Sequence, residues 1–205
     1  MGHRLDLAAN LMRLFVAVPV GDEVRAASAR VRASIERALE QLKSTPPRLV
    51  WTIPRGLHLT LRFLGEQPED RVPALVEAAH EPYPFAPFVL RWHGLGAFPS
   101  PRHPRAIWLG VGKGARELGR LELEVARRFG GLITGETLDE ARPFHPHLTM
   151  ARVKTEAKGL DWPDVLASAE VDDVSSRVGH VGLYRSRGLP GGEGYEEIGR
   201  GRLDG

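Results

Sequence analysis

A four-residue motif that occurs twice carries the chemistry of this sequence. Residues 58–61 read His-Leu-Thr-Leu, and residues 147–150 read His-Leu-Thr-Met. Each copy lies in a stretch with strand character, and on a strand the side chains of residues i and i+2 point to the same face. His58 and Thr60 would therefore share one face of a strand, as would His147 and Thr149. Two such strands brought together would surround a pocket with two imidazoles and two hydroxyls.

These four side chains suit the hydrolysis of a phosphodiester. An ordinary imidazole pKa is about 6.5, so near pH 7 one histidine can act as a base and the other as an acid. Hydrolysis at a phosphate needs water deprotonated on one side and the leaving oxygen protonated on the other. Hydroxyl donors can stabilise the charge that grows on the non-bridging oxygens. A single His-x-Thr is most often a structural pair, but the repetition predicts one joint site.

A metal site is the main alternative use of these histidines. His145 and His147 have the His-x-His spacing that zinc sites also use, and His58 could complete a set of three. No carboxylate or cysteine near the motifs supports such a site. The sequence therefore predicts neither a metal nor a cofactor, and His145 is expected at the entrance of its strand or as a residue that orients the site.

Other residues near the motifs have two interpretations each. Arg62, two residues after Thr60, faces the cleft or caps the sheet edge. Phe63, Phe144 and Trp51 belong to the core or form platforms on which a nucleobase stacks, and for the two phenylalanines the core is favoured. The remaining histidines are expected to be structural or on the surface: His80, His93, His103 and His180.

The composition is that of an ordinary globular protein. The 205 residues, 42% of them hydrophobic and 26% charged, suffice for one compact domain or two small lobes. There are no cysteines, which excludes disulfides, thiolate metal sites and a cysteine nucleophile. No apolar run is long enough to span a membrane and no signal peptide is recognisable, so a cytoplasmic location without membrane association is expected.

The pattern of apolar residues predicts strands and helices that alternate along the chain. Residues 1–11 are expected to be a disordered extension, and residues 12–205 one domain of two lobes. The two motifs occupy comparable places in the two halves, each after a helix, which suggests duplicated lobes with a cleft between them. Helices are predicted at 22–43, 69–80, 115–129 and 164–169. Strands are predicted at 14–20, 49–52, 57–64, 85–95, 107–111, 147–153, 170–175, 178–186 and 195–203, with Pro- and Gly-rich loops at 96–105 and 188–194.

Three segments together resemble a known family. They are Arg-Leu-Phe-Val-Ala-Val-Pro at 13–19, His-Leu-Thr-Leu-Arg-Phe-Leu-Gly at 58–65 and Pro-Phe-His-Pro-His-Leu-Thr-Met-Ala-Arg at 143–152. The pair of motifs and their spacing resemble the 2H phosphoesterase superfamily. The flanks are similar to its RNA 2′,3′-cyclic phosphodiesterase branch, historically called 2′-5′ RNA ligase. The likeness runs from about Met12 to the C-terminus.

The resemblance implies a fold and a role for each residue of the site. The fold would be bilobal α+β with pseudo-twofold symmetry, in which two antiparallel sheets line a central cleft and helices lie outside. The activity would be metal-independent hydrolysis of RNA 2′,3′-cyclic phosphate ends to 2′-phosphomonoesters. His58 would protonate the leaving O3′, and His147 would activate water. Thr60 and Thr149 would bind the non-bridging oxygens, and Arg152 would add positive charge.

Two other functions remain open at this stage. One is reversible 2′-5′ RNA ligation by the same site. The other is a catalytically silent module that binds RNA or nucleotides, although binding alone would not need both histidines. In each case the partner is an RNA end or a nucleotide with a 2′,3′-cyclic phosphate, and a monomer is expected.

Overall fold

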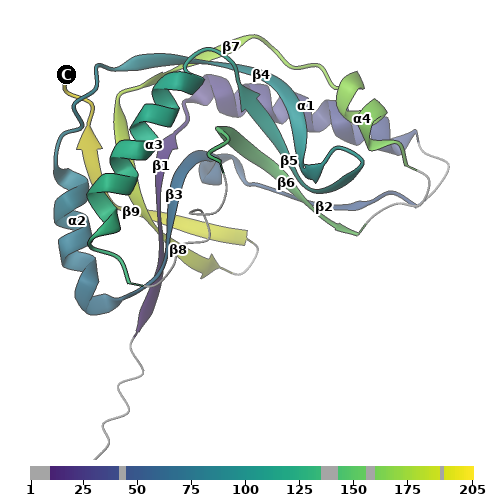
Figure 1. Cartoon of the computed structure of the whole chain (residues 1–205). Coiled ribbons are helices and arrows are strands. Elements are labelled where there is room, and N and C mark those ends of the chain that lie inside the picture. The colour runs from purple at the N-terminus through teal and green to yellow at the C-terminus, as the bar shows by residue number, and fades with distance from the viewer. Residues whose placement is uncertain (1–9, 42–44, 135–142, 156–159, 190–191) are drawn as a thin grey trace, which may run out of the picture.

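The computed structural model describes residues 10–41, 45–134, 143–155, 160–189 and 192–205 (Figure 1). The described chain forms strands and α-helices in the following order: β1 (Leu11–Pro19), α1 (Asp22–Glu40), β2 (Arg48–Trp51), β3 (His58–Pro68), α2 (Val72–His80), β4 (Phe88–Ser100), β5 (His103–Val111), α3 (Ala115–Gly130), β6 (His147–Thr155), α4 (Trp162–Ser168), β7 (Val174–Val178), β8 (His180–Leu189) and β9 (Gly192–Arg202). Short 3-10 turns at Pro54–Gly56 and Glu69–Arg71 precede β3 and α2.

The strands form two sheets, which confirms the expected α+β class. The first sheet has the order β3-β1-β8-β9 and the second has the order β2-β6-β5-β4-β7. Every neighbouring pair of strands in both sheets is antiparallel. The two motifs lie at the starts of β3 and β6, one in each sheet, and these two strands contact each other. The fold therefore brings the two copies of the motif face to face.

The lobes do not correspond to the two halves of the sequence. Helices α2 and α3 pack on the first sheet, against β9 and β3, whereas α1 and α4 pack together on the second sheet, against β7 and β4 (Figure 1). Helix α1 follows a strand of the first sheet but covers the second, and α3 makes the opposite crossing. The chain thus passes repeatedly between the lobes, which ties the two walls of the cleft to each other.

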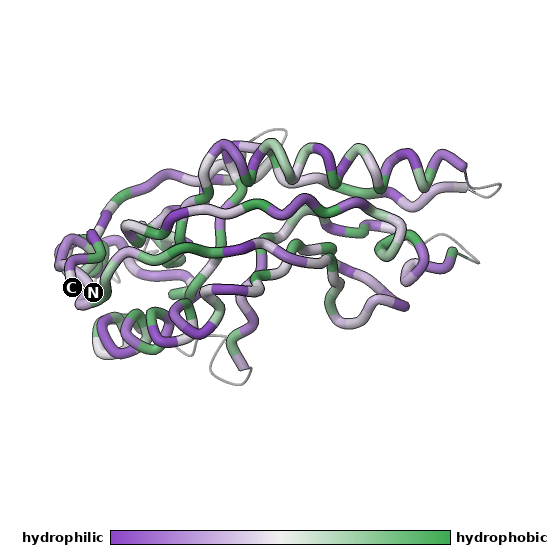
Figure 2. Tube along the Cα trace, turned by 90° about the horizontal axis from the view of Figure 1, so that it is seen from above, coloured by the Kyte–Doolittle hydropathy of each residue, from purple (hydrophilic) through white to green (hydrophobic). Residues whose placement is uncertain are grey.

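The two long helices bury the residues that their periodicity predicts. Green and purple alternate along the helices in Figure 2, as expected for helices with one apolar face. In α1 the buried positions include Val24, Val31, Ile35 and Leu39. In α3 they are Leu118, Leu121, Glu122, Val125 and Phe129, and the only charged one, Glu122, has a specific partner described below.

The predicted loop at 96–105 is wrong, because β4 and β5 continue through it as a hairpin. Gly96 pairs with Trp108 and Ser100 with His103. A Cβ at Gly96 would lie 2.2 Å from the Trp108 ring, so the glycine is what allows the ring to cover the strand. Pro99 and Pro104 face each other near the turn, at strand ends where a missing N–H is tolerated. Glycine and proline here shape a strand pair and do not interrupt it.

The ends of several other elements also differ from the prediction. The strand expected at 170–175 begins at Val174, and α1 ends at Glu40, before residue 43. The helix expected from residue 69 starts with a 3-10 turn, because Pro73 restricts the α-helix to Val72–His80. Leu11, which was expected to belong to a disordered extension, is the first residue of β1 and pairs with Pro68 of β3. Residues 1–9 lie outside the described residues, so the expected extension stays a prediction.

Candidate active site

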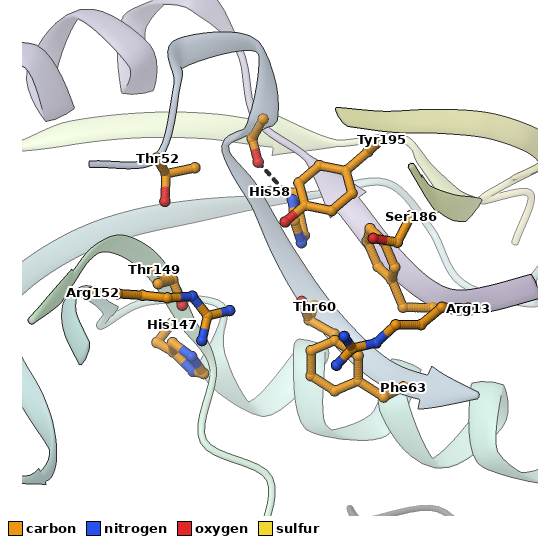
Figure 3. A pocket seen from close by; sticks show the side chains of 12 residues that line it. Arg13, Thr52, His58, Thr60, Phe63, His147, Thr149, Arg152, Ser186 and Tyr195 are labelled. Carbon is orange, nitrogen blue, oxygen red and sulfur yellow. Dashed lines mark hydrogen bonds between the residues drawn. The ribbon is translucent and has the colours of Figure 1, made fainter. Parts of the chain in front are cut away.

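A small cavity lies where β3 and β6 face each other. Its volume is about 110 Å³, and Figure 3 shows the side chains that line it. Strand β3 contributes His58, Thr60 and Phe63, and β6 contributes His147, Thr149 and Arg152. The structure thus brings together the two histidines, the two threonines and the arginine that the sequence singled out. Their catalytic roles stay predictions.

The two imidazoles are held in the same way. His58 Nδ1 lies 2.7 Å from the carbonyl oxygen of Gly56, and His147 Nδ1 lies 2.7 Å from that of His145. A carbonyl oxygen only accepts, so Nδ1 carries the hydrogen in both rings and Nε2 is the nitrogen that gains or loses a proton. Both rings therefore present the same tautomer to a bound molecule.

Aromatic rings fix the two imidazoles further. The His58 ring lies 4.8 Å from the rings of Phe15 and Tyr195, measured between centroids. The His147 ring lies 5.0 Å from the ring of Phe98 in an edge-to-face arrangement. This packing restricts the rings, so Nε2 is already oriented before a substrate binds.

The protonated form of His147 is less stable than that of an exposed histidine, because the ring is largely buried. Burial lowers the pKa of His147 below its ordinary value, and the nearby charge of His145 lowers the pKa further. The hydrogen bond to the carbonyl of His145 opposes this shift but does not reverse it. At neutral pH the His147 imidazole is therefore neutral, as a general base must be.

A bulge in β6 brings Arg152 into the cavity. Thr149 pairs with Trp108 and Ala151 with Ile107, so Met150 is an extra residue in β6. Met150 and Ala151 are both buried, and the side chain of Arg152 returns to the face of Thr149. Without this extra residue, Arg152 would lie on the opposite face of the strand.

A bulge in β3 acts in the same way on Phe63. Thr60 pairs with Ala17 and Arg62 with Val16, so Leu61 has no partner of its own in β1. Phe63 then shares the cavity face with His58 and Thr60, and 41% of it is exposed. The aromatic side chain is therefore part of the cleft wall and is not a core residue.

Arg62 holds the strand that carries the first motif. Its guanidinium Nη1 lies 2.6 Å from Oε1 of Glu122 on α3, and both side chains are nearly buried, with 14% and 11% exposed. Arg62 does not line the small cavity but lines a larger groove beside it. The ion pair fixes β3 against α3 and so supports the position of Thr60.

The other predicted neighbours of the site lie outside the small cavity. Phe144 and His145 line the larger groove, and the His145 ring packs 4.7 Å from the ring of Trp108. Trp51 ends β2, lies under the guanidinium of Arg32, and lines neither space. Within the described residues, no three His, Cys, Asp or Glu side chains are grouped as a metal site would require.

Several residues of the cavity were missed by the sequence analysis. Arg13 and Phe15 come from β1, and Figure 3 shows Arg13 and Arg152 reaching toward the cavity from opposite sides. Ser186 and Tyr195 pair across β8 and β9, and both line the cavity, where the Tyr195 ring packs against His58. Thr52 and Gly56 come from the segment between β2 and β3. Only the segment at 13–19, part of the resemblance, could have directed attention to Arg13.

None of the described helices is both long and apolar enough to cross a membrane.

Known proteins share the sequence pattern of this chain. A family model described as the 2′-5′ RNA ligase superfamily matches residues 33–189. A protein of Archaeoglobus fulgidus named RNA 2′,3′-cyclic phosphodiesterase is 38% identical over 143 residues, which cover 70% of this chain and 73% of that protein. The protein of the same name from Thermus thermophilus is 36% identical over 168 residues, covering 74% and 77%. The match to the Aeropyrum pernix protein of that name spans about half (54%) of its length.

Solved structures share the fold. The crystal structure of TT0787 of Thermus thermophilus superposes with a TM-score of 0.73 at 28% identity, covering 94% of this chain and 98% of that one. The crystal structure of Escherichia coli LigT complexed with 3′-AMP gives a TM-score of 0.64 at 26% identity, covering 95% and 99%.

Proposed function

Because the chain belongs to the 2′-5′ RNA ligase superfamily, we propose that it is an RNA 2′,3′-cyclic phosphodiesterase. This hydrolase opens the strained cyclic phosphate at an RNA end and leaves a 2′-phosphomonoester, with two histidines and no metal. The observation that carries the proposal is the matched pair of imidazoles, in each of which a carbonyl oxygen holds Nδ1, so that Nε2 is the nitrogen that can gain or lose a proton.

The two histidines divide the proton transfers. His147 Nε2 takes a proton from water, and the water oxygen bonds to phosphorus. The bond from phosphorus to O3′ breaks, and His58 Nε2 gives its proton to O3′. Each turnover leaves His147 protonated and His58 neutral, and exchange with solvent restores both. The lowered pKa of His147 supports its assignment as the base.

The remaining polar residues of the cavity stabilise the charged transition state. Thr60 and Thr149 donate hydroxyl hydrogens to the non-bridging oxygens, and Arg152 supplies a planar cation from the second sheet. Arg13 supplies a second cation from the first sheet. Because these donors are held by strands of both sheets, they are oriented before the reaction begins.

The setting of the reaction completes the proposal. The substrate is an RNA end or a nucleotide with a 2′,3′-cyclic phosphate, and the enzyme works as a monomer in the cytoplasm. The absence of cysteine from the sequence is consistent with a reducing compartment. Ligation to a 2′-5′ linkage is the reverse use of the same site, and in water hydrolysis dominates.

The test is the hydrolysis of RNA with a 2′,3′-cyclic phosphate end in excess EDTA. We expect full activity and a product that is purely the 2′-phosphate, identified by phosphorus NMR and by resistance to a 3′-specific phosphatase. A 3′-phosphate product would mean that O2′ is the leaving oxygen and that the acid and base assignments of the two histidines must be exchanged. Activity lost in EDTA and restored by Zn²⁺ would contradict the metal-independent mechanism. Binding without turnover would indicate the silent module.

A further inference from the structure

A groove much larger than the catalytic cavity opens beside it. Its volume is about 980 Å³, and it shares Thr60, Phe63, His147 and Arg152 with the cavity. From these shared residues it runs toward α3, the β4–β5 hairpin and the segment before β6. The side chains of its lining that matter for binding are Phe98, Arg105, Glu122, Leu123, Phe144 and His145.

The two volumes differ in what they can hold. The catalytic cavity of about 110 Å³ is smaller than the roughly 300–1,000 Å³ typical of sites for drug-sized ligands. It has room for a phosphate and part of a ribose, so the rest of the substrate must lie outside it. The groove, at about 980 Å³, has room for a nucleoside and a neighbouring phosphate, and it begins at the residues around the cavity.

The lining of the groove combines aromatic rings with cationic groups. Phe63, Phe98, Phe144 and His145 offer ring faces or edges to nucleobases. Arg105 on β5 is exposed, and within the described residues it forms no ion pair. Sites that bind single-stranded nucleic acid combine aromatic rings with cationic side chains, because the bases stack on the rings and the phosphates pair with the cations.

The carboxylate in the groove does not oppose this use. Glu122 is neutralised by Arg62, with 2.6 Å between guanidinium Nη1 and carboxylate Oε1. With this pair neutral, Arg105 and Arg152 give the described lining a net positive charge. Leu123 adds an apolar side chain of which 67% is exposed, at the edge of the groove on α3.

We propose that this groove binds the RNA strand on the 5′ side of the cyclic phosphate, with Arg105 contacting the phosphate of the preceding linkage. The inference rests on the proposed function, because the cyclic phosphate must occupy the adjoining cavity. The consequence is a preference for RNA ends over mononucleotides. A mononucleoside 2′,3′-cyclic phosphate lacks that linkage and makes no contact with Arg105.

The experiment compares two substrates and a matched pair of variants. The substrates are a trinucleotide and a mononucleoside, each ending in a 2′,3′-cyclic phosphate. The variants are Arg105→Gln and Arg102→Gln. Both arginines are exposed on the same hairpin, but only Arg105 lines the groove, so the pair separates a local contact from a change in net charge.

We expect Arg105→Gln to lower kcat/KM for the trinucleotide about tenfold, the scale of a lost charge-assisted contact, and to leave the mononucleoside value unchanged. The trinucleotide value should also become less sensitive to salt. Arg102→Gln should leave kcat/KM unchanged for both substrates. A further variant, Leu123→Glu, should lower kcat/KM for the trinucleotide only, because the new carboxylate repels the RNA phosphates. Leu123→Ala should leave this value unchanged.

Three results would overturn the inference. One is equal kcat/KM for the two substrates in the unmodified enzyme. Another is an equal effect of Arg105→Gln on both substrates, and the third is an equal effect of the two arginine variants. In each case the mononucleoside would still be hydrolysed, so the proposed function would stand. Failure to hydrolyse either substrate would overturn the proposed function and this inference with it.

Discussion

His58 and His147 are equivalent in their local structure. Each begins its strand, and each places Nδ1 2.7 Å from the carbonyl oxygen of the residue two positions earlier. The equivalence extends to the bulges, which place Phe63 five residues after His58 and Arg152 five residues after His147 on the cavity face. The two imidazoles differ in their surroundings, since His58 packs against Phe15 and Tyr195 whereas His147 packs against Phe98.

The first prediction concerns the need for both histidines. His58→Ala and His147→Ala should each lower kcat by about a hundredfold or more, the usual scale for a general acid or base. The double variant should be scarcely worse than either single one, because the pair acts as a unit. Steady-state kinetics on cyclic-phosphate RNA measures all three. His93→Ala, an exposed residue on β4, is the matched control. Near-normal turnover in either single variant would rule out the two-histidine mechanism.

The second prediction concerns pH. Because burial lowers the pKa of His147, the base should stay neutral, and kcat/KM should stay high, to a pH below about 6.5. The profile should be bell-shaped, since His58 must be protonated. His145→Ala removes a nearby charge and exposes His147, and both effects raise the pKa of His147. The acidic limb should therefore move to higher pH in this variant. A shift to lower pH would contradict the assignment of His147 as the base.

The third prediction concerns Arg152. Arg152→Met should lower kcat/KM about a hundredfold, the scale for losing one transition-state donor, and Arg152→Lys should recover only part of that loss. The lysine variant keeps the charge but lacks the planar fork. Arg177→Met, an exposed position on β7 away from the cavity, is the control and should behave as the unmodified protein. Equal activity of the methionine and lysine variants would mean that Arg152 does not contact the phosphate through its charge.

The fourth prediction concerns stability. Gln67 is fully buried, and its side chain accepts a hydrogen bond from the backbone N–H of Thr134 at 2.9 Å and donates to the carbonyl oxygens of Leu64 and Thr134. Gln67→Leu would leave these backbone groups without their partner, at a cost of about 1–3 kcal/mol for a buried group. Urea unfolding should show this loss, and Gln41→Leu at an exposed position should not. An unchanged unfolding midpoint for Gln67→Leu would show that water replaces the amide.

Local periodicity explains what the sequence predicted well. An alternating pattern places His58 beside Thr60 and His147 beside Thr149 whatever the rest of the chain does, since the geometry of a strand decides it. The apolar faces of α1 and α3 follow in the same way from helical spacing. The motif pair and the amphipathic helices could therefore be predicted from neighbours in sequence alone.

Strand ends and hairpins were harder to predict, because they depend on pairing. The segment 96–105 has the glycine and proline of a loop, yet it is strand, since Gly96 accommodates the Trp108 ring from the partner strand. This role of Gly96 can be recognised only when the register of the two strands is known, because Trp108 lies on the partner strand. The same reason explains the misplaced start of β7.

The composition of the site beyond the motifs was decided by tertiary structure. Arg152 faces the cavity because β6 holds one more residue than β5 at Met150, and a one-residue difference in register turns a side chain to the other face. Arg13 and Tyr195 reach the cavity because β1 and β9 are neighbours of β3 and β8 in the first sheet. The sequence by itself determined which side chains are the candidates for the chemistry, because the histidine and threonine of each motif lie two residues apart on one face of a strand. Only the tertiary structure decided which other side chains meet them, because strands distant in sequence pair through long-range contacts that no local pattern encodes.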